Sequence, residues 1–314
     1  MQQSEDVKPP STEAIVARWS DFAVVYNHKL MYQFEGIGVQ MFNMVGAYDA
    51  ESILEIGCGD GSIATIYCTL KKQNATLICS DMSPVMCKIA RGRFDALSQQ
   101  NKEGRLMGGR IEVLKHRDLA ALDWDSASGV KWPDLGVELY EANAEDIKTV
   151  MPKDDSVDCC ISNLTLQIVS DPKKMLAECF RVTKPGGKCI FSVWGNEEDS
   201  QNVTIWNKMC EKFDIEQDPR SNFYLNDRCR TIKILEDAGF THILAWESMT
   251  PSIPISPQEE DEQIRNRIAK VIEVGIERYK AAYDYFVCEV KKTTEIRKFP
   301  IGLSVLFFLG TKPK

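Results

Sequence analysis

The sequence lacks several features that would direct it to particular classes of protein. Its net charge is −8 and its isoelectric point is about 5.2, so it offers no basic face for a nucleic-acid backbone. No CxxC pair occurs among its 11 cysteines, which argues against a disulfide framework and against a structural zinc site. We therefore expect reduced, mostly buried thiols, no bound metal and no nucleic-acid partner.

Long apolar runs are also missing. The most apolar stretch, "IGLSVLFFLG" at 301–310, is too short to cross a bilayer. The chain does not open with a basic segment followed by an apolar one, which is the pattern of a secretory signal. These features predict a cytoplasmic protein without stable membrane insertion.

What the sequence does contain is an alternation of short apolar runs with segments of helical spacing. Runs of strand length lie at 52–57, 75–81, 137–143, 157–163, 188–195, 241–249 and 301–312. Strands that alternate with helices predict a parallel sheet covered on both faces. The predicted fold is therefore α/β: a Rossmann-like, doubly wound, mainly parallel seven-stranded sheet with helices on both faces.

The same pattern predicts how the chain is divided. We expect an N-terminal helical cap at 1–48 and a core at 49–250, with an irregular insertion at about 101–136. Residues 251–298 are expected to form a linker and an amphipathic helical insertion, a candidate lid, and 299–314 to return as the final strand.

Local signals add four smaller expectations. Gly36 and Gly38 are expected to break the aromatic-rich helical cap, and the "PGG" segment at 185–187 to form a turn. The segment at 110–115 is a candidate strand or extra hairpin. The helical pattern at 264–290 predicts either one long helix or two that are broken near Gly275.

Three glycines follow the first predicted strand and precede the first predicted helix of the core, at Gly57, Gly59 and Gly61. Glycine allows a sharp turn and a close approach of a ligand to the backbone, and the N–H groups that begin a helix favour an anionic group. In open α/β sheets the ligand crevice lies beyond the carboxyl ends of the strands. This position therefore predicts a cofactor site.

Two motifs for other cofactors are absent. The dinucleotide pattern G-x-G-x-x-G would need glycine at Ser62, and no G-x-x-x-x-G-K-[ST] is present for a nucleoside triphosphate. Asp81 ends the second predicted strand, where a carboxylate can accept hydrogen bonds from both hydroxyls of a ribose. The cofactor is therefore expected to contain an unphosphorylated ribose.

Five segments in order, "LEIGCGDGS", "CSDMS", "EANAEDI", "SNLTLQ" and "KPGGKCIFSVWG", resemble the class I S-adenosylmethionine-dependent methyltransferases. The similarity is greatest to the small-molecule group, type 11, that includes the ubiquinone and menaquinone biosynthesis methyltransferases, and it covers about residues 50 to 195. The resemblance implies S-adenosylmethionine as the cofactor. It implies cofactor contacts from Glu55, Gly57, Cys58, Gly59, Gly61, Asp81, Met82, Ala144, Glu145, Asn163, Leu164 and Gln167.

Within that set the resemblance implies particular roles. The glycine segment would surround the methionine part of the cofactor, Asp81 would hold the ribose hydroxyls, and Met82 would pack on the adenine. Ala144 and Glu145 would lie at the adenine edge. The family often has an acid where this chain has Asn143, and Asp146 is a candidate to compensate. Asn163 and Leu164 would lie near the sulfonium, with Gln167 beyond them.

The acceptor is expected to be a small or lipid-like molecule. Strand four ends in "SNLTLQ" rather than in the [ND]-P-P-[YF] of enzymes that methylate amines on nucleic acids. Candidate catalytic residues are Tyr26 and His28, in a segment that the resemblance places across the cofactor mouth, together with Asn163. The aromatic stripe around Tyr279 and Tyr283 fits a lid, core packing or a dimer face, so a homodimer or a partner subunit stays open.

Two other functions compete with an active methyltransferase. One is a methyltransferase-fold protein that binds cofactor as a partner or regulatory subunit, and the other is a nicotinamide-dependent oxidoreductase. The intact glycine segment and Asp81 favour activity, and the glycine spacing disfavours a nicotinamide cofactor.

Overall fold

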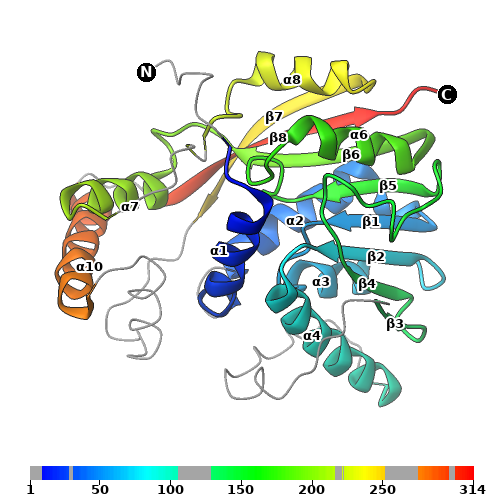
Figure 1. The fold of residues 1–314 in the computed structure, drawn as a ribbon, viewed down its shortest axis with the longest axis horizontal. Coiled ribbons are helices and arrows are strands. Elements are labelled where there is room, and N and C mark those ends of the chain that lie inside the picture. The colour runs from blue at the N-terminus through cyan, green and yellow to red at the C-terminus, as the bar shows by residue number, and fades with distance from the viewer. Residues whose placement is uncertain are drawn as a thin grey trace.

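The computed structural model describes residues 9–27, 31–104, 129–215, 221, 223–251, 275–296 and 301–314. A sheet of eight strands in the order β3-β4-β2-β1-β5-β6-β8-β7 runs through it (Figure 1). The strands are β1 Ser52–Ile56, β2 Thr76–Asp81, β3 Val130–Trp132, β4 Val137–Glu141, β5 Val157–Ser162, β6 Thr183–Trp194, β7 Thr241–Pro251 and β8 Gly302–Thr311. The described helices are α1 Thr12–Val25, α2 Met31–Val45, α3 Ser62–Leu70, α4 Pro84–Lys102, α6 Pro172–Val182, α7 Gln201–Lys212, α8 Arg228–Asp237 and α10 Ile276–Lys291.

Strands β4, β2, β1, β5 and β6 are parallel to one another, whereas β8 is antiparallel to both of its neighbours. The α/β, doubly wound, mainly parallel architecture is thus confirmed. The sheet has one strand more than the predicted seven, because β3 pairs antiparallel with β4 at the edge. This short strand lies in the segment that we expected to be irregular, and the candidate strand at 110–115 lies outside the described residues.

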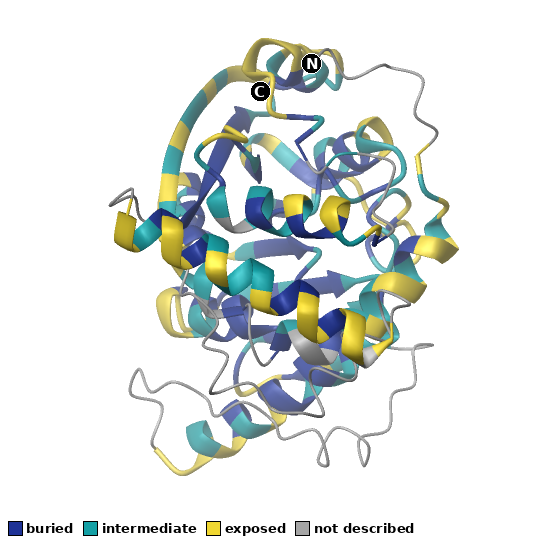
Figure 2. Ribbon diagram, turned by 90° about the vertical axis from the view of Figure 1, so that its left-hand side faces the viewer, coloured by how far each residue is buried: buried dark blue, intermediate teal, exposed yellow. Residues whose placement is uncertain are grey.

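Two apolar clusters cover the two faces of the sheet. Side chains from α2, α3 and α4 pack on one face, and side chains from α6 and α8 pack on the other. Figure 2 shows the buried strands between helices whose outer sides are exposed. Burial on both faces explains why the parallel strands have nearly continuous apolar sequences.

Gly36 and Gly38 do not break the cap, contrary to our expectation, because both lie inside α2. A Cβ atom at Gly38 would lie 2.3 Å from Cγ2 of Ile63, and the Tyr67 hydroxyl donates to the Gly38 carbonyl at 3.1 Å. Glycine at this position therefore lets α2 pack closely against α3.

Two other local expectations have clear outcomes. The segment at 185–187 is part of β6, where a register shift against β5 accommodates it and where Gly186 and Gly187 pair with Lys312. Helix α10 begins directly after Gly275, whose backbone is extended, so the helical pattern is interrupted there. The residues before Gly275 in this pattern lie outside the described part.

The aromatic stripe of α10 is packed rather than free. Tyr279 and Tyr283 are 1% and 5% exposed, and α10 shares an apolar cluster with α7 that includes Met209 and Ala282.

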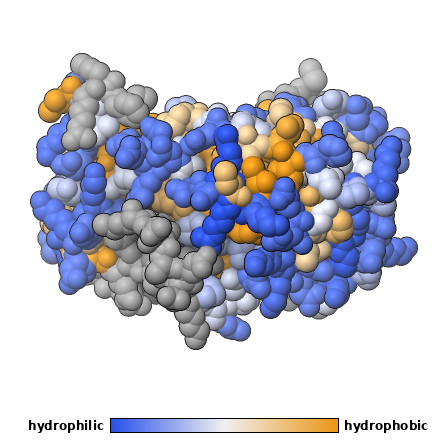
Figure 3. Space-filling view, turned by 90° about the horizontal axis from the view of Figure 1, so that it is seen from above, coloured by the Kyte–Doolittle hydropathy of each residue, from blue (hydrophilic) through white to orange (hydrophobic). Residues whose placement is uncertain are grey.

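Figure 3 views the molecule from above, over α8, and shows mostly hydrophilic side chains with apolar ones gathered in one area. No described helix has the length and apolar character that spanning a bilayer requires.

Candidate cofactor and active site

The strand order reverses at β1, which lies between β2 on one side and β5 on the other. In a doubly wound sheet such a switch point opens a crevice beyond the carboxyl ends of the strands. Helix α1 lies at these carboxyl ends, on the left of the strands in Figure 1. The glycine segment follows β1 directly, so the predicted site and the switch point coincide.

The three glycines all have positive φ angles, of 72° at Gly57, 56° at Gly59 and 75° at Gly61. A Cβ at Gly57 would lie 2.1 Å from Oγ1 of Thr165, and one at Gly61 would lie 2.9 Å from Cβ of Ala90. A Cβ at Gly59 would meet only a ring carbon of Tyr26, at 3.8 Å. Protein packing therefore requires glycine at 57 and 61, whereas the space at Gly59 is open to a ligand.

Asp81 holds the glycine segment from the neighbouring strand. Its Oδ2 accepts a hydrogen bond from the Gly59 N–H at 2.9 Å, and its Oδ1 accepts one from the Ser83 N–H at 2.9 Å. The Gly57 and Cys58 N–H groups donate to the Ser80 carbonyl, which fixes the segment against the end of β2. Burial raises the pKa of Asp81 to about 6 even though backbone N–H groups favour its charged form.

Two further carboxylates lie beside Asp81. Glu55 is 2% exposed, and burial, followed by the charges of Asp60 and Asp81, raises its pKa to about 8. Asp60 is 1% exposed and forms an ion pair with Arg93 at 3.0 Å. The site thus contains three acidic side chains and, among the described residues, one paired cation, an arrangement that suits a cationic ligand.

Helix α1 covers this edge and is tied down on both sides of the crevice. The hydroxyls of Ser20 and Ser83 lie 2.9 Å apart, and the Ser170 hydroxyl donates to the Pro10 carbonyl at 2.8 Å. Tyr26, directly after α1, stacks on Phe34 of α2 with ring centroids 5.8 Å apart. These contacts place the aromatic ring of Tyr26 beside Gly59.

The end of β5 forms the opposite wall. Leu164 has a φ of 53°, a left-handed conformation that is unusual for a branched side chain. Its N–H donates to the Ser192 hydroxyl at 2.9 Å, and that hydroxyl donates in turn to Oδ1 of Asn163 at 2.7 Å. Ser192 therefore orients Asn163 and holds the backbone of Leu164.

The family described as "Methyltransferase domain" matches residues 117–191 of this chain. The malonyl-[acyl-carrier protein] O-methyltransferase of Serratia marcescens is 24% identical over 180 residues, which are 57% of this chain and 52% of that protein. The ubiquinone/menaquinone biosynthesis C-methyltransferase of Francisella tularensis is 23% identical over 225 residues, 66% of this chain and 73% of that one. By these matches the chain is similar to the class I S-adenosylmethionine-dependent methyltransferases.

A solved structure agrees with this fold. The phosphoethanolamine N-methyltransferase 2 of Haemonchus contortus, in complex with phosphomonomethylethanolamine and S-adenosylhomocysteine, superposes with a TM-score of 0.53 at 16% identity. The match covers 97% of this chain and 61% of the other protein. The chain spans between 29% and 52% of the length of three of the curated relatives that it matches.

S-adenosylmethionine is the cofactor of this family, and the residues at the switch point fit it. Gly59 leaves open the space that a side chain would fill. Asp81 uses its oxygens for two N–H groups and retains lone pairs for ribose hydroxyls. Asp81 offers a carboxylate to a ligand that carries a sulfonium and an ammonium group, and such a ligand favours the charged form of the buried Glu55.

Several of the predicted site residues have structural partners as well. Glu145 accepts hydrogen bonds from the Ser170 and Asp171 N–H groups, and Asn143 accepts one from the Glu145 N–H. Asp146 is exposed. These bonds shape the connections after β4 and β5.

The remaining predicted residues differ in how far they are buried. Ala144 and Cys58 pack in the apolar clusters, while Met82 is half-buried at the end of β2. Gln167 is 3% exposed, and its Oε1 has no partner within the described chain. His28 lies outside the described residues.

Sequence reasoning missed Ser192, Thr165 and Arg93. Arg93 carried a usable signal, since it shares one face of α4 with Ile89 and Leu97, both buried. A charged residue in an apolar helical stripe indicates a buried partner. Ser192 and Thr165 are ordinary strand and loop residues, and their contacts to Asn163, Leu164 and Gly57 arise only from the tertiary fold.

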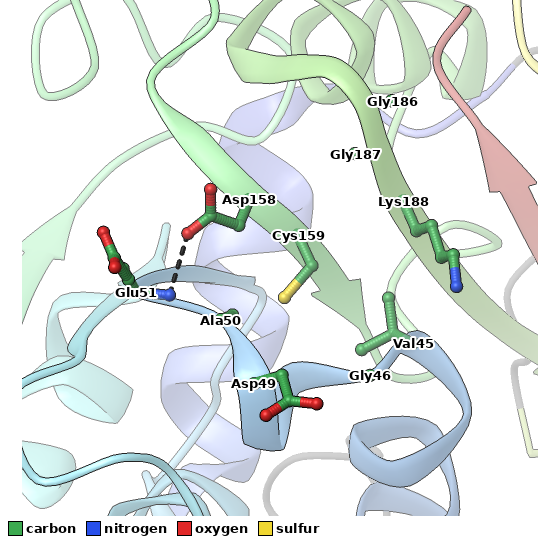
Figure 4. A pocket seen from close by; sticks show the side chains of 10 residues that line it. All are labelled: Val45, Gly46, Asp49, Ala50, Glu51, Asp158, Cys159, Gly186, Gly187 and Lys188. Carbon is green, nitrogen blue, oxygen red and sulfur yellow. Dashed lines mark hydrogen bonds between the residues drawn. The ribbon is translucent and has the colours of Figure 1, made fainter.

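A hollow of about 370 Å³ lies at the other edge of the sheet, near the amino ends of β1 and β5 (Figure 4). Asp49, Glu51, Asp158 and Lys188 contribute its charged side chains. Ligands of doubly wound sheets bind at the carboxyl ends of the strands, whereas this hollow lies at the amino ends.

Proposed function

We propose that this chain transfers a methyl group from S-adenosylmethionine to a small or lipid-like acceptor by direct displacement. The observation that carries the proposal is the open space at Gly59, bordered by the Asp81 carboxylate and by the ring of Tyr26. Direct displacement requires that the nucleophile be held in line with the methyl group and that water be excluded. Helix α1, tethered across the crevice, supports both requirements.

We propose the following roles for the site residues. Gly57, Cys58, Gly59 and Gly61 would bind the methionine part through their backbone, with Glu55 providing negative charge below it. Asp81 would bind the ribose, and Met82, Ala144 and Glu145 would surround the adenine. Asn163, Leu164 and Gln167 would lie toward the reacting methyl group.

Tyr26 is suited to orient the acceptor rather than to remove a proton from it. Burial and then the charges of Asp60, Asp81 and Glu55 raise the pKa of Tyr26 well above its ordinary value. A phenol that stays protonated can donate a hydrogen bond but is a poor base at neutral pH. We therefore propose an acceptor that arrives deprotonated or easily loses its proton, such as a carboxylate or an acidic carbon.

The chemistry in the names of two relatives supports this choice. One acts on the oxygen of a malonyl group and the other is a C-methyltransferase of quinone biosynthesis. A carboxylate and an electron-rich ring carbon need little help from a general base. We propose further that residues 1–48 act as the cap of the site, and that 251–298 form a linker and a helical insertion between the core at 49–250 and the final strand at 299–314.

Two experiments test the proposal. Calorimetry should show binding of S-adenosylhomocysteine and none of reduced nicotinamide dinucleotide. Methyl-labelled S-adenosylmethionine, incubated with the protein and a set of small organic acids and quinone precursors, should then yield a labelled product. Binding without any transfer would favour a partner or regulatory subunit, and absence of binding would reject the cofactor assignment.

A further inference from the structure

Arg93 is a charged side chain at the centre of the site that the proposed chemistry does not use. It lies on α4, is 1% exposed, and is the largest of the fully buried side chains. Its Nη2 lies 2.6 Å from Oδ1 of Asn27, 2.8 Å from Sδ of Met31 and 3.0 Å from Oδ2 of Asp60. One nitrogen thus contacts three separate parts of the chain.

The three partners of Arg93 lie in the glycine segment and near the junction of α1 and α2. Asp60 stands between Gly59 and Gly61 in the glycine segment, and its Oδ1 also accepts a hydrogen bond from the Ser62 N–H at 3.1 Å. Asn27 directly follows Tyr26, and Met31 is the first residue of α2. Arg93 therefore connects the glycine segment to the junction between the two cap helices.

Within the residues that the structure describes, the hydrogen bonding of this cluster is incomplete. Nη2 has two hydrogens for three acceptors, while Nε of Arg93 and Nδ2 of Asn27 have no partner in the described part of the chain, although Asn27 is 0% exposed. Unsatisfied buried donors lower stability. A cluster serving stability alone would be better satisfied, so this one calls for a functional explanation.

We propose that Arg93 couples the glycine segment to the cap, so that a ligand bound at Gly59 also stabilises α1 and Tyr26 over it. This inference rests on the proposed cofactor site. A ligand between Gly59 and Tyr26 touches both parts that Arg93 joins. Coupling of this kind is a free energy shared between two regions, and it acts equally in both directions.

The test uses hydrogen–deuterium exchange of the full chain with and without S-adenosylhomocysteine. In the native protein the ligand should lower exchange in the glycine segment and in α1. Asn27→Asp keeps the shape and the acceptor oxygen and removes the unpartnered donor, so the protection of α1 should persist. Asn27→Leu keeps a similar volume without an acceptor, and the ligand-dependent protection of α1 should fall at least about fivefold.

Affinity provides a second measure. By reciprocity, Asn27→Leu should weaken S-adenosylhomocysteine binding by about the same factor of five, while Asn27→Asp binds like the native chain. Asn27→Ala serves as a second acceptor-free variant if the leucine is not accommodated. Arg93→Met, which removes the whole guanidinium group, should lower both the protection of α1 and the affinity at least as much as Asn27→Leu. Arg91→Met, on the same helix but partly exposed and paired with Asp95, is its matched control and should leave both unchanged.

The outcomes separate this inference from the proposed function. If the ligand binds and protects the glycine segment but α1 does not respond, or if α1 responds equally in both Asn27 variants, the coupling is rejected and the cofactor site stands. If calorimetry shows no binding to the native chain, the cofactor site itself is rejected, and the coupling with it.

Discussion

Two aspartates on the same sheet have pKa values that are shifted in opposite directions. Asp158, near the amino end of β5, accepts hydrogen bonds from the Glu51 and Ser52 N–H groups at 2.8 and 2.9 Å and from Lys184 at 2.7 Å. Burial raises its pKa, but the Lys184 ammonium and these N–H groups outweigh it and hold the pKa below its usual value. Asp81, at the carboxyl end of β2, has no such cation among the described residues, and its pKa rises to about 6.

The difference separates a structural edge of the sheet from a functional one. At the amino edge, the protein itself satisfies the carboxylate, so nothing further is required there. At the carboxyl edge, the buried Glu55 and the half-buried Asp81 have raised pKa values, which means that the folded protein disfavours their charged forms. Perturbed acids in a crevice are typical of a site that is completed by a ligand.

The largest expected effect comes from two glycines, one at each edge. Gly59 and Gly46 both have positive φ, and a Cβ at either would have no atom within 3.4 Å, so valine strains the backbone similarly at each. Gly59→Val should weaken S-adenosylhomocysteine binding by at least about 100-fold, or about 2.7 kcal/mol, because the side chain fills the cofactor space. Gly46→Val is the control, and calorimetry should find its affinity unchanged.

A valine at 59 that still permits tight binding would remove the glycine segment from the site. Circular dichroism and thermal melts of both variants should show a similar loss of stability, of about 1–2 kcal/mol from the left-handed backbone. A much greater loss at Gly59 alone would mean that the effect on binding is not specific.

The second prediction compares alanine substitutions at the two aspartates. Asp81→Ala should weaken S-adenosylhomocysteine binding by about 1.5–3 kcal/mol, since two charge-assisted hydrogen bonds to the ribose are lost. It should lower the unfolding free energy of the free protein less than Asp158→Ala does, because removing a desolvated carboxylate offsets part of the loss of its two backbone hydrogen bonds. Asp158→Ala should do the reverse, lowering stability by about 1–2 kcal/mol for a partly exposed pair and leaving affinity unaltered.

Denaturant melts of both variants measure the change in stability, and calorimetry measures the change in affinity for S-adenosylhomocysteine. If Asp158→Ala weakened binding as much as Asp81→Ala, the two edges would not differ in the way that their surroundings indicate.

The features of the fold and of the candidate site that depend on neighbouring residues in the chain could be predicted from the sequence. The apolar runs predicted all the parallel strands, because strands buried on both faces need apolar side chains. The spacing of Gly57, Gly59 and Gly61 and the position of Asp81 at a strand end predicted the cofactor site. Both signals depend on local backbone geometry, so neighbouring residues in the chain are enough to place these parts of the site.

Other features depend on residues far apart in the chain. Glycine is usually a helix breaker, yet at Gly38 it allows close packing of α2 against Ile63. The ion pair of Arg93 with Asp60 and the bonds of Ser192 to Asn163 require the folded sheet. Likewise, β3 is only three residues long and pairs at an edge, where no apolar run is required.

The third prediction concerns pH and tests whether the carboxyl edge carries unsatisfied acids. Glu55 titrates near 4.5 when unfolded and near 8 in the folded protein. The folded state therefore holds a proton that the unfolded state has released, and its stability should fall as pH rises from about 5 to 8. Glu55→Gln removes this titration, so thermal melts of that variant should depend less on pH over the same range.

A cationic ligand should offset part of the free-energy cost of ionising the buried Glu55. At pH 7 Glu55 is mostly protonated in the free protein, and a nearby sulfonium favours its charged form. S-adenosylmethionine should therefore release more protons on binding than S-adenosylhomocysteine, which lacks the sulfonium charge. Calorimetry in two buffers of different ionisation enthalpy measures this release, and Glu55→Gln should reduce the difference between the ligands. Equal release from both ligands in the native chain would place the sulfonium away from Glu55, because only a charge close to a buried acid shifts its pKa so strongly.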